Sequence, residues 1–297
     1  MDCVLHTSNI VKKYGDRTVL KNVNMNIYKG DIYGFIGKNG AGKTTFMRVV
    51  LGLTPKDGGE VIYYDNKSIN DVGLKVGSLI ESPGLYKNAS AYENLKRFSI
   101  LYGADESKIN EILDMVGLKN TGKRKAKDFS LGMRQRLGIA IALLNDPDLL
   151  ILDEPINGLD PEGIKEIRDV IVKLNKERNI TILISSHLLD ELSKVVTRYG
   201  IINNGELIEE ISAKELKEKC KNKLIIEADD VKKANKILET ILPKEDITIN
   251  NDVIEISSHL DESSKINRKL VEYGISVNAI YPNLDSLEDY FMKRIGD

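Results

Sequence analysis

One segment constrains the fold of this 297-residue chain more than any other: FIGKNGAGKTTFMRVV, residues 35–50. Its glycines and its lysine follow the spacing G-x-x-x-x-G-K-[ST] from Gly37 to Thr44. Glycine costs conformational entropy on folding, so several glycines together indicate that the backbone closely approaches a ligand. Residues 31–36 are typical of a strand and residues 43–51 of a helix. The segment therefore predicts a P-loop, whose backbone N–H groups bind phosphate at a helix N-terminus.

The loop and the first helical turn supply the expected nucleotide-binding residues. We expect Lys43 to reach the β- and γ-phosphates and the Thr44 hydroxyl to ligate Mg²⁺. The alternative is an ordinary glycine-rich turn, but the complete motif between a strand and a helix favours the P-loop. A P-loop alone does not distinguish a kinase, a GTPase and an ATPase. The expected phosphate-binding residues are Gly37, Asn39, Gly40, Ala41, Gly42, Lys43, Thr44 and Thr45.

Composition and charge exclude several other classes of protein. The content of 41% apolar and 30% charged residues suits a globular protein, and a net charge of −2 gives no basic field for nucleic acid. Cys3 and Cys220 lie far apart in the sequence, so we expect neither a disulfide scaffold nor a zinc site. This cysteine usage is typical of a protein in the reducing cytosol. No apolar run approaches the roughly 18 residues of a membrane span. The N-terminal MDCVLHTSNI lacks a signal-peptide core. We expect a cytoplasmic protein whose membrane role, if any, comes through a partner.

The order of predicted elements indicates an α/β fold with two domains. Strands expected at 19–27, 31–36, 149–152 and 180–184 alternate with helices, which indicates a parallel sheet covered on both faces. Residues 87–145 show only helical patterns and are predicted to be a helical insertion. After about Lys219 the composition changes, and the order strand, helix, two strands, helix, strand, helix predicts a small ferredoxin-like α+β domain. We expect a nucleotide-binding domain over 1–218 and an accessory domain over 221–297.

Three later segments narrow the choice of P-loop protein. They are DFSLGMRQRL (128–137), LLILDEPINGLDP (149–161) and LISSHLLDE (183–191). Together with the P-loop, these segments resemble an ATP-binding-cassette (ABC) protein over about residues 5–210. No guanine-reading Asn-Lys-x-Asp motif is present, which argues against a GTPase. The resemblance implies an ABC-type P-loop fold, ATP and Mg²⁺ as cofactors, and ATP hydrolysis.

The resemblance also implies roles for four residues outside the loop. Asp153 would hold Mg²⁺ through water, and Glu154 would orient and deprotonate the attacking water. His187 would touch the γ-phosphate and this water from the other side. Tyr14 would stack on adenine, although a tyrosine there could also belong to the core. For Asp153 and Glu154 the alternative is a structural ion pair, and for His187 a structural histidine.

A second phosphate-binding end is expected at the signature segment, residues 129–133. Ser130 is placed to cap a helix whose first N–H groups are free to bind an anion, with Gly132 beside it. The resemblance resolves this duplication with a head-to-tail dimer, in which each signature segment closes over the ATP of the second copy. Asp160 would lie at that interface.

Three residues depart from the common family pattern. Leu131 and Met133 stand where the family has Gly and Gln. Leucine does not readily take positive φ and methionine offers no amide donor, so we expect a weaker γ-phosphate contact. Glu81 stands where the family usually has Gln. Like charges 4 Å apart cost on the order of 4 kcal/mol at an effective dielectric of 20. We therefore predict Glu81 on the metal side, as a catalytic residue and a Mg²⁺ ligand together with Thr44 and Asp153.

The leading functional hypothesis is the ATPase subunit of an ABC exporter. It would lie on the cytoplasmic face of the membrane, peripheral, binding two integral-membrane permease subunits through the helical insertion. Glu81 and the sequence Ser-Leu-Gly-Met resemble the cassettes of bacitracin-type and lantibiotic-immunity exporters, which implies a peptide antibiotic or another hydrophobic cargo. The alternative is a non-transport ABC ATPase acting on ribosomes or DNA. The single P-loop disfavours a ribosome-acting protein, and the short insertion disfavours a DNA-repair protein. The basic segment 119–127 could contact lipid headgroups or nucleic acid, but it is more typical of a solvated connector.

Overall fold

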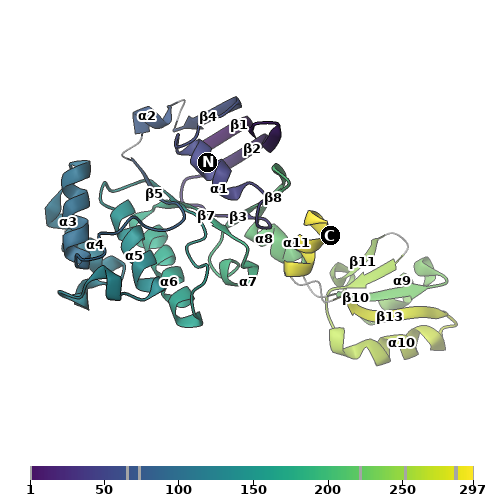
Figure 1. Ribbon diagram of the computed structural model, residues 1–297. Coiled ribbons are helices and arrows are strands. Elements are labelled where there is room, and N and C mark those ends of the chain that lie inside the picture. Colours follow the sequence, from purple (N-terminus) through teal and green to yellow (C-terminus); the bar gives the residue numbers. More distant parts are fainter. Residues whose placement is uncertain are drawn as a thin grey trace. The chain divides into compact units, whose positions relative to one another are not determined.

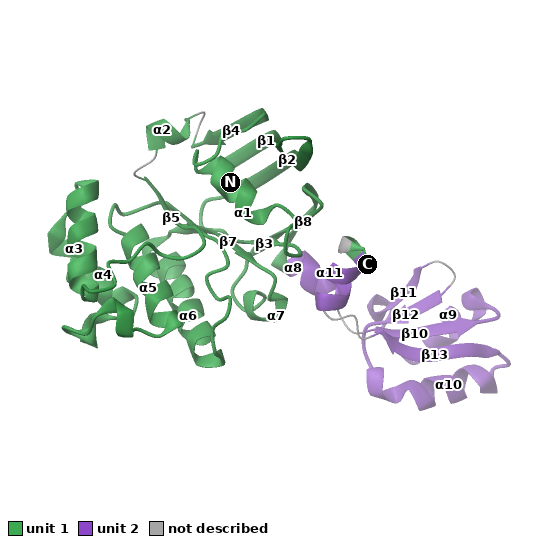
Figure 2. Ribbon diagram, in the orientation of Figure 1, with its two compact units in different colours: residues 1–213, 294–297 green, residues 214–293 purple. Residues whose placement is uncertain are grey.

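The computed structural model describes residues 2–64, 67–72, 75–220, 223–250, 253–283 and 287–296. The chain forms two compact units, shown in green and purple in Figure 2: unit 1 comprises residues 1–213 and 294–297, and unit 2 residues 214–293. The expected boundary between 218 and 221 falls inside unit 2, and the expected division into domains stays a prediction.

Unit 1 is built on a six-stranded sheet with the order β5-β6-β7-β3-β8-β9. Its first five strands are parallel, and β9 pairs antiparallel with β8. β6 and β7 are buried along their whole lengths, as expected for apolar strands covered on both faces. The predicted α/β class is confirmed. The strands are β3 (Ile32–Ile36), β5 (Val76–Leu79), β6 (Leu149–Leu152), β7 (Thr181–Ser186), β8 (Arg198–Asn203) and β9 (Glu206–Ser212).

A three-stranded antiparallel sheet completes the nucleotide-binding part of unit 1. Its order is β2 (Arg17–Tyr28), β1 (Cys3–Tyr14) and β4 (Gly58–Tyr63). Helix α1 (Lys43–Val50) packs Phe46 and Met47 into one core with residues of both sheets. Figure 1 shows α1 beside this small sheet. Because α1 follows the P-loop directly, its packing against both sheets fixes the position of the loop.

The helical insertion of unit 1 contains α3 (Ala91–Tyr102), α4 (Ile109–Met115) and α5 (Leu131–Ala142), with short 3₁₀ helices between them. α3 begins at Ser90 with the expected capping box: the Glu93 N–H donates to Ser90 Oγ, and Ser90 N–H donates to Glu93 Oε2. α5 packs against the long helix α6 (Pro161–Arg178). Two four-residue helices, α2 (Ile69–Val72) and α7 (Leu189–Leu192), complete the unit.

Unit 2 has the ferredoxin-like order of elements that the sequence predicts. Its antiparallel sheet runs β11-β12-β10-β13, and α9 and α10 supply apolar side chains to one core with it. Helix α8 leads into the unit and α11 follows β13. The elements are α8 (Ala213–Lys219), β10 (Lys223–Ala228), α9 (Val231–Leu238), β11 (Ile247–Asn250), β12 (Val253–Ile256), α10 (Ser263–Glu272), β13 (Val277–Asn283) and α11 (Leu287–Ile295).

Helix α5 lies close to the end of β5 because a glycine faces that strand. A Cβ atom on Gly138 would lie 2.8 Å from Pro83 Cβ and 2.9 Å from Leu79 Cδ1. Both neighbours are held in place, Pro83 by its ring and Leu79 by its burial at the end of β5. The close approach therefore requires glycine, although glycine weakens a helix interior by about 1 kcal/mol relative to alanine.

Gly138→Ala should destabilise unit 1 by about 1–3 kcal/mol, because overpacking outweighs the gain in helix propensity. Gly84→Ala is the matched control, because a Cβ there meets open space. Urea unfolding measures both. A stabilised Gly138→Ala chain would contradict the close packing.

Candidate active site

The predicted catalytic residues meet at one edge of the parallel sheet. β3 and β7 pair in parallel through Ile36 and Ser186, and β6 pairs with β7 through Leu152 and Ile184. The P-loop follows β3, the acidic pair follows β6, and His187 follows β7. The carboxyl ends of neighbouring parallel strands are where ligands of open α/β sheets bind. The topology therefore places these segments together.

The P-loop holds its lysine in a buried position. Gly42, before α1, has φ +110°, and a Cβ there would lie 2.9 Å from Leu20 Cδ2. Lys43 Nζ donates to the Gly37 carbonyl at 2.6 Å and lies 3.2 Å from Glu154 Oε1. This ion pair lacks hydrogen-bond geometry: Oε1 is buried and accepts no hydrogen bond from the described residues. A buried lysine needs such partners.

A pocket of about 330 Å³ opens beside the loop. Gly37 and Ala41 of the predicted set are buried and do not line it. The lining residues are Arg17, Val19, Asn39, Gly40, Gly42, Lys43, Thr44, Thr45 and Glu154. Arg17 and Val19 were not predicted; they come from β2, and no local pattern links that strand to the loop.

The acidic pair belongs to a chain of hydrogen bonds. Thr44 Oγ1 donates to Asp153 Oδ2 at 2.7 Å, and Ser185 Oγ donates to Asp153 Oδ1 at 2.6 Å. The Glu154 N–H donates to Ser185 Oγ at 2.8 Å. Asp153 and Ser185 are buried. Ser185 was not among the predicted site residues; its signal is a polar residue near the carboxyl end of a buried parallel strand.

His187 and Lys43 share the Glu154 carboxylate. His187 Nδ1 lies 2.8 Å from Glu154 Oε2, while Lys43 lies beside Oε1. Glu154 has φ +47°, a region that costs a non-glycine residue on the order of 1–3 kcal/mol and persists only where its surroundings fix it. The structure thus brings together the predicted Lys43, Thr44, Asp153, Glu154 and His187.

Glu81 forms an ion pair with an arginine of α1. It follows β5 with φ +59°, and its exposed carboxylate pairs with Arg48 Nη2 of α1 at 2.5 Å. Among the described residues it has no hydrogen bond to Thr44 or Asp153, and no three acidic, histidine or cysteine side chains gather as a metal site. The nearest cation, Arg48, holds the carboxylate instead. Metal ligation by Glu81 stays a prediction.

Tyr14 is 50% exposed at the end of β1, with Lys12 Nζ 5.2 Å from its ring centre. It therefore does not belong to the core. Its ring is available for stacking, but it does not line the P-loop pocket. Adenine stacking stays a prediction.

A second, separate pocket of about 530 Å³ contains the signature segment. Ser130 caps α5 by accepting from the Met133 N–H at 3.1 Å, and Asp160 caps α6 by accepting from the Gly163 N–H at 3.0 Å. Leu131 is the first residue of α5 and is absent from the positive-φ residues of the described chain, so the expected backbone conflict does not arise. The lining residues are Ser130, Leu131, Gly132, Met133, Arg136, Gly158, Leu159, Asp160, Glu162, Gly163 and Glu166.

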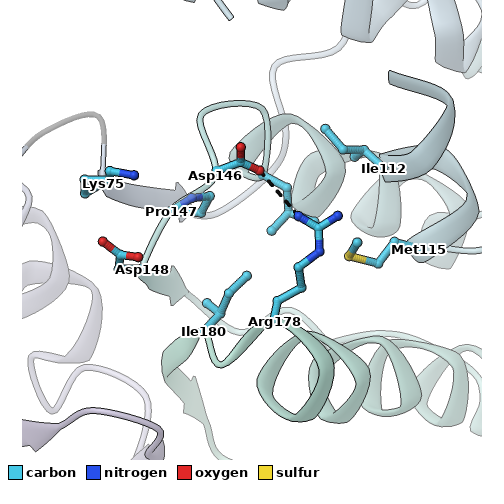
Figure 3. Close-up of a pocket in the computed structure, with 9 residues that line it drawn as sticks. Lys75, Ile112, Met115, Asp146, Pro147, Asp148, Arg178 and Ile180 are labelled. Atoms are coloured by element: carbon cyan, nitrogen blue, oxygen red, sulfur yellow. Dashed lines mark hydrogen bonds and ion pairs between the residues drawn. The ribbon is translucent and has the colours of Figure 1, made fainter. Parts of the chain in front are cut away.

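A third pocket, of about 200 Å³, contains none of the predicted residues (Figure 3). One of its charged residues, Arg178, lies 3.4 Å from Asp146 and also pairs with Glu111 of α4. These ion pairs link the end of α6 to the helical insertion. The pocket therefore belongs to the packing of the insertion, not to the nucleotide site.

A P-loop after a parallel strand, with a buried acid hydrogen-bonded to its threonine, defines the class of P-loop nucleoside triphosphatases. The ABC transporter family profile matches residues 20–157. The bacitracin transport ATP-binding protein BcrA of Bacillus licheniformis is 45% identical over 100% of this chain and 98% of its own. The lantibiotic transport ATP-binding protein SrtF of Streptococcus pyogenes is 48% identical over 75% of this chain and 99% of its own.

Solved structures of ATP-binding cassettes share the fold of this chain. A dimeric, post-hydrolysis structure of the ATP-binding cassette MJ0796 bound to ADP and Pi has a TM-score of 0.61 and 25% identity, covering 70% of this chain and 98% of its own. The chain belongs to the ATP-binding proteins of ABC transporters, which are ATPases. In the described part of the chain, no helix combines the length and apolarity needed to cross a bilayer.

Ser185→Ala should lower the free energy of unfolding by about 1–3 kcal/mol, because a buried Asp153 oxygen loses its donor. The half-buried Ser193 is the control: the one hydrogen bond of its hydroxyl among the described residues goes to the Asp190 carbonyl at an exposed position, so Ser193→Ala should change stability by less than about 0.5 kcal/mol. Urea unfolding compares the two. Equal effects would contradict the proposed importance of the buried contact.

Proposed function

We propose that this chain hydrolyses Mg·ATP to drive the export of a peptide antibiotic or a similarly hydrophobic cargo. The observation that carries the proposal is the contact of Thr44 with the buried Asp153, beside Lys43 and Glu154. The names of BcrA and SrtF, which are bacitracin and lantibiotic transport proteins, support the cargo class. The chain would act on the cytoplasmic face of the membrane, bound to two permease subunits.

Thr44 and Asp153 fit a magnesium site. A hydroxyl and a carboxylate are the hard oxygen ligands that Mg²⁺ prefers, usually with water and substrate phosphates completing its shell. Ser185 fixes one oxygen of Asp153, so the other faces Thr44 in a set direction. Bound Mg²⁺ would supply charge compensation for the phosphates. Glu81 would join this side only by leaving Arg48.

Glu154 is suited to orient and deprotonate the attacking water. Its buried Oε1 accepts no hydrogen bond from the described residues, and its Oε2 is held by His187. Lys43 would exchange its ion pair with Glu154 for a phosphate oxygen, which leaves Oε1 to accept a hydrogen bond from water. His187 would then keep the carboxylate aimed and touch the γ-phosphate.

The signature pocket would complete the ATP site of a second copy. Its lining residues and those of the P-loop pocket do not overlap, so within this chain they form two separate half-sites. A head-to-tail homodimer places each α5 N-terminus, with Ser130 and Gly132, over the other copy's phosphates. Asp160, which lines the same pocket, would lie in the interface. The MJ0796 structure, which is dimeric and bound to ADP and Pi, supports a dimer.

The helical insertion carries a surface suited to the permease subunits. Helix α3 and the preceding turn expose large apolar side chains, which is unusual without a binding partner. Tyr86, Phe98 and Tyr102 form an aromatic row, with ring centres 5.7 and 5.8 Å apart. We call this surface the α3 surface; its exposed members are Tyr86, Tyr92, Ile100, Leu101 and Tyr102.

Glu154→Gln should lower the rate of ATP hydrolysis by about 10²–10⁴-fold while nucleotide affinity stays within about twofold, because the base is lost and the loop is intact. Steady-state hydrolysis and equilibrium nucleotide binding measure the two effects. Glu177→Gln, on the exposed side of α6, is the control. A Glu154→Gln chain as active as the control would exclude the assigned role.

Replacing Leu101 with Ser should weaken co-purification with the permease subunits at least about fivefold, because it removes a large apolar contact from the α3 surface. Hydrolysis by the isolated chain should not change. Ile208→Ser, at an exposed apolar residue of β9, is the control.

In reconstituted vesicles, peptide antibiotic should accelerate ATP hydrolysis by the unmodified complex of this chain with its permease subunits. An unresponsive complex would argue against the cargo class.

A further inference from the structure

A single buried amide organises the turn before α3. Asn94 is 0% exposed. Its Oδ1 accepts from the Tyr86 N–H at 2.8 Å. Its Nδ2 lies within hydrogen-bonding distance of three carbonyl oxygens, those of Tyr86 at 3.2 Å, Ala89 at 3.3 Å and Ser90 at 2.8 Å. One side chain thus fixes both ends of a five-residue turn, 86–90.

Only an amide provides this set of contacts. The Asn94 side chain is an acceptor toward one N–H and a donor toward the carbonyls, and the NH₂ group supplies two protons. A carboxylate of the same size keeps the acceptor but offers no donor and adds charge among carbonyl oxygens. An apolar side chain offers neither. Each buried group left unpaired would destabilise the turn.

The turn held by Asn94 pairs with the segment that leads to the signature. The Ala126 N–H donates to the Ala89 carbonyl and the Lys127 N–H to the Lys87 carbonyl, both at 2.9 Å. Lys125 Nζ donates to the Asn88 carbonyl at 3.0 Å. The chain 125–127 therefore takes its position from backbone groups of 87–89.

From this segment the path to Ser130 is short. The Phe129 N–H donates back to the Ala126 carbonyl at 3.2 Å, and Ser130 follows as the cap of α5. At the other end of the path, Tyr86 belongs to the α3 surface. The turn 86–90 thus joins the surface assigned to the permease to the start of the signature helix.

We propose that Asn94 is a positioning residue for the signature half-site. It lines neither the P-loop pocket nor the signature pocket, and it acts through the turn 86–90 and segment 125–127. It fixes where Ser130 and the α5 N-terminus are presented to the second copy, and it transmits displacement of Tyr86 to them. The inference rests on the proposed dimeric function.

The first test reads the path directly by amide hydrogen exchange. In Asn94→Asp, the amides of Ala126 and Lys127 should exchange at least about tenfold faster, because the turn that supplies their acceptors is released. Ser99→Ala is the control: Ser99 is also buried in α3, but its hydroxyl bonds only within the helix, to Lys96. Unchanged exchange at Ala126 and Lys127 would overturn the inference.

A second variant covers the case in which Asn94→Asp does not fold, which faster exchange in α1 would reveal. Ala126→Pro deletes the N–H that donates to Ala89, at the first position of a 3₁₀ helix, a backbone position that suits proline. The preceding Lys125 has ψ 148°, which proline tolerates. This chain should show faster exchange at Lys127. Protection at Lys127 as in the unmodified chain would overturn the inference.

The second test separates positioning from folding. In a Glu154→Gln background, adding Asn94→Asp should leave single-chain nucleotide affinity within about twofold and weaken Mg·ATP-dependent dimerisation at least about tenfold. Analytical ultracentrifugation measures the dimerisation. If the chain with both substitutions dimerises as tightly as the Glu154→Gln parent, the inference about Asn94 is overturned, while the proposed dimeric function stands. If the parent Glu154→Gln chain does not dimerise, the proposed dimeric function falls, and the inference falls with it.

Discussion

The nucleotide site depends on the hydrogen bonds that the buried Asp153 carboxylate accepts from Thr44 and Ser185. These three residues come from α1, from the end of β6 and from β7, so the contacts tie the P-loop helix to two strands of the sheet. A buried carboxylate without donors would be strongly destabilising. Both oxygens of the buried Asp153 carboxylate accept a hydrogen bond, so this polar group is satisfied beside the P-loop. Glu154 is the next residue in the chain, and its N–H donates to Ser185 Oγ, so the same contacts also fix its position.

The second constraint is that the two segments predicted to bind phosphate line separate pockets of this chain. Lys43 and Glu154 line one pocket, and Ser130 with Gly132 lines another. If the two pockets complete one another in the proposed dimer, a two-fold axis makes two equal sites from two copies. In this account Asn94 and the turn 86–90 matter because they set the position of the second surface. The permease, through the α3 surface, would act on that position.

The sequence predicts those features that are local. The P-loop, the strand 149–152, the α3 capping box and the ferredoxin-like order of unit 2 follow from spacing and periodicity within short segments, and the structure has them. β1, β4, β5, β8 and β9 were not predicted. β4 and β5 are short strands that pair with segments distant in the chain. β8 and β9 form a local hairpin around Asn204-Gly205, a turn signal that the sequence does contain and that the prediction missed. In the candidate site, too, the sequence predicts local features but not long-range contacts. Glu81 was placed from the family pattern and from charge repulsion, and its partner Arg48 is a long-range contact that no spacing reveals. Ser185 and Asn94 were missed because their importance lies in the groups they touch.

The most direct measurement is complementation of the two half-sites in a Glu154→Gln background. One copy carries Lys43→Ala in the P-loop, and the other carries Ser130→Arg in the signature segment. Alone, neither chain should retain occluded ATP, because each homodimer has two defective sites. Mixed, one copy's intact loop meets the other's intact signature, so the account predicts one occluded ATP per mixed pair. No occlusion by the mixture, where the parent Glu154→Gln chain retains two ATP per dimer, would contradict the shared site.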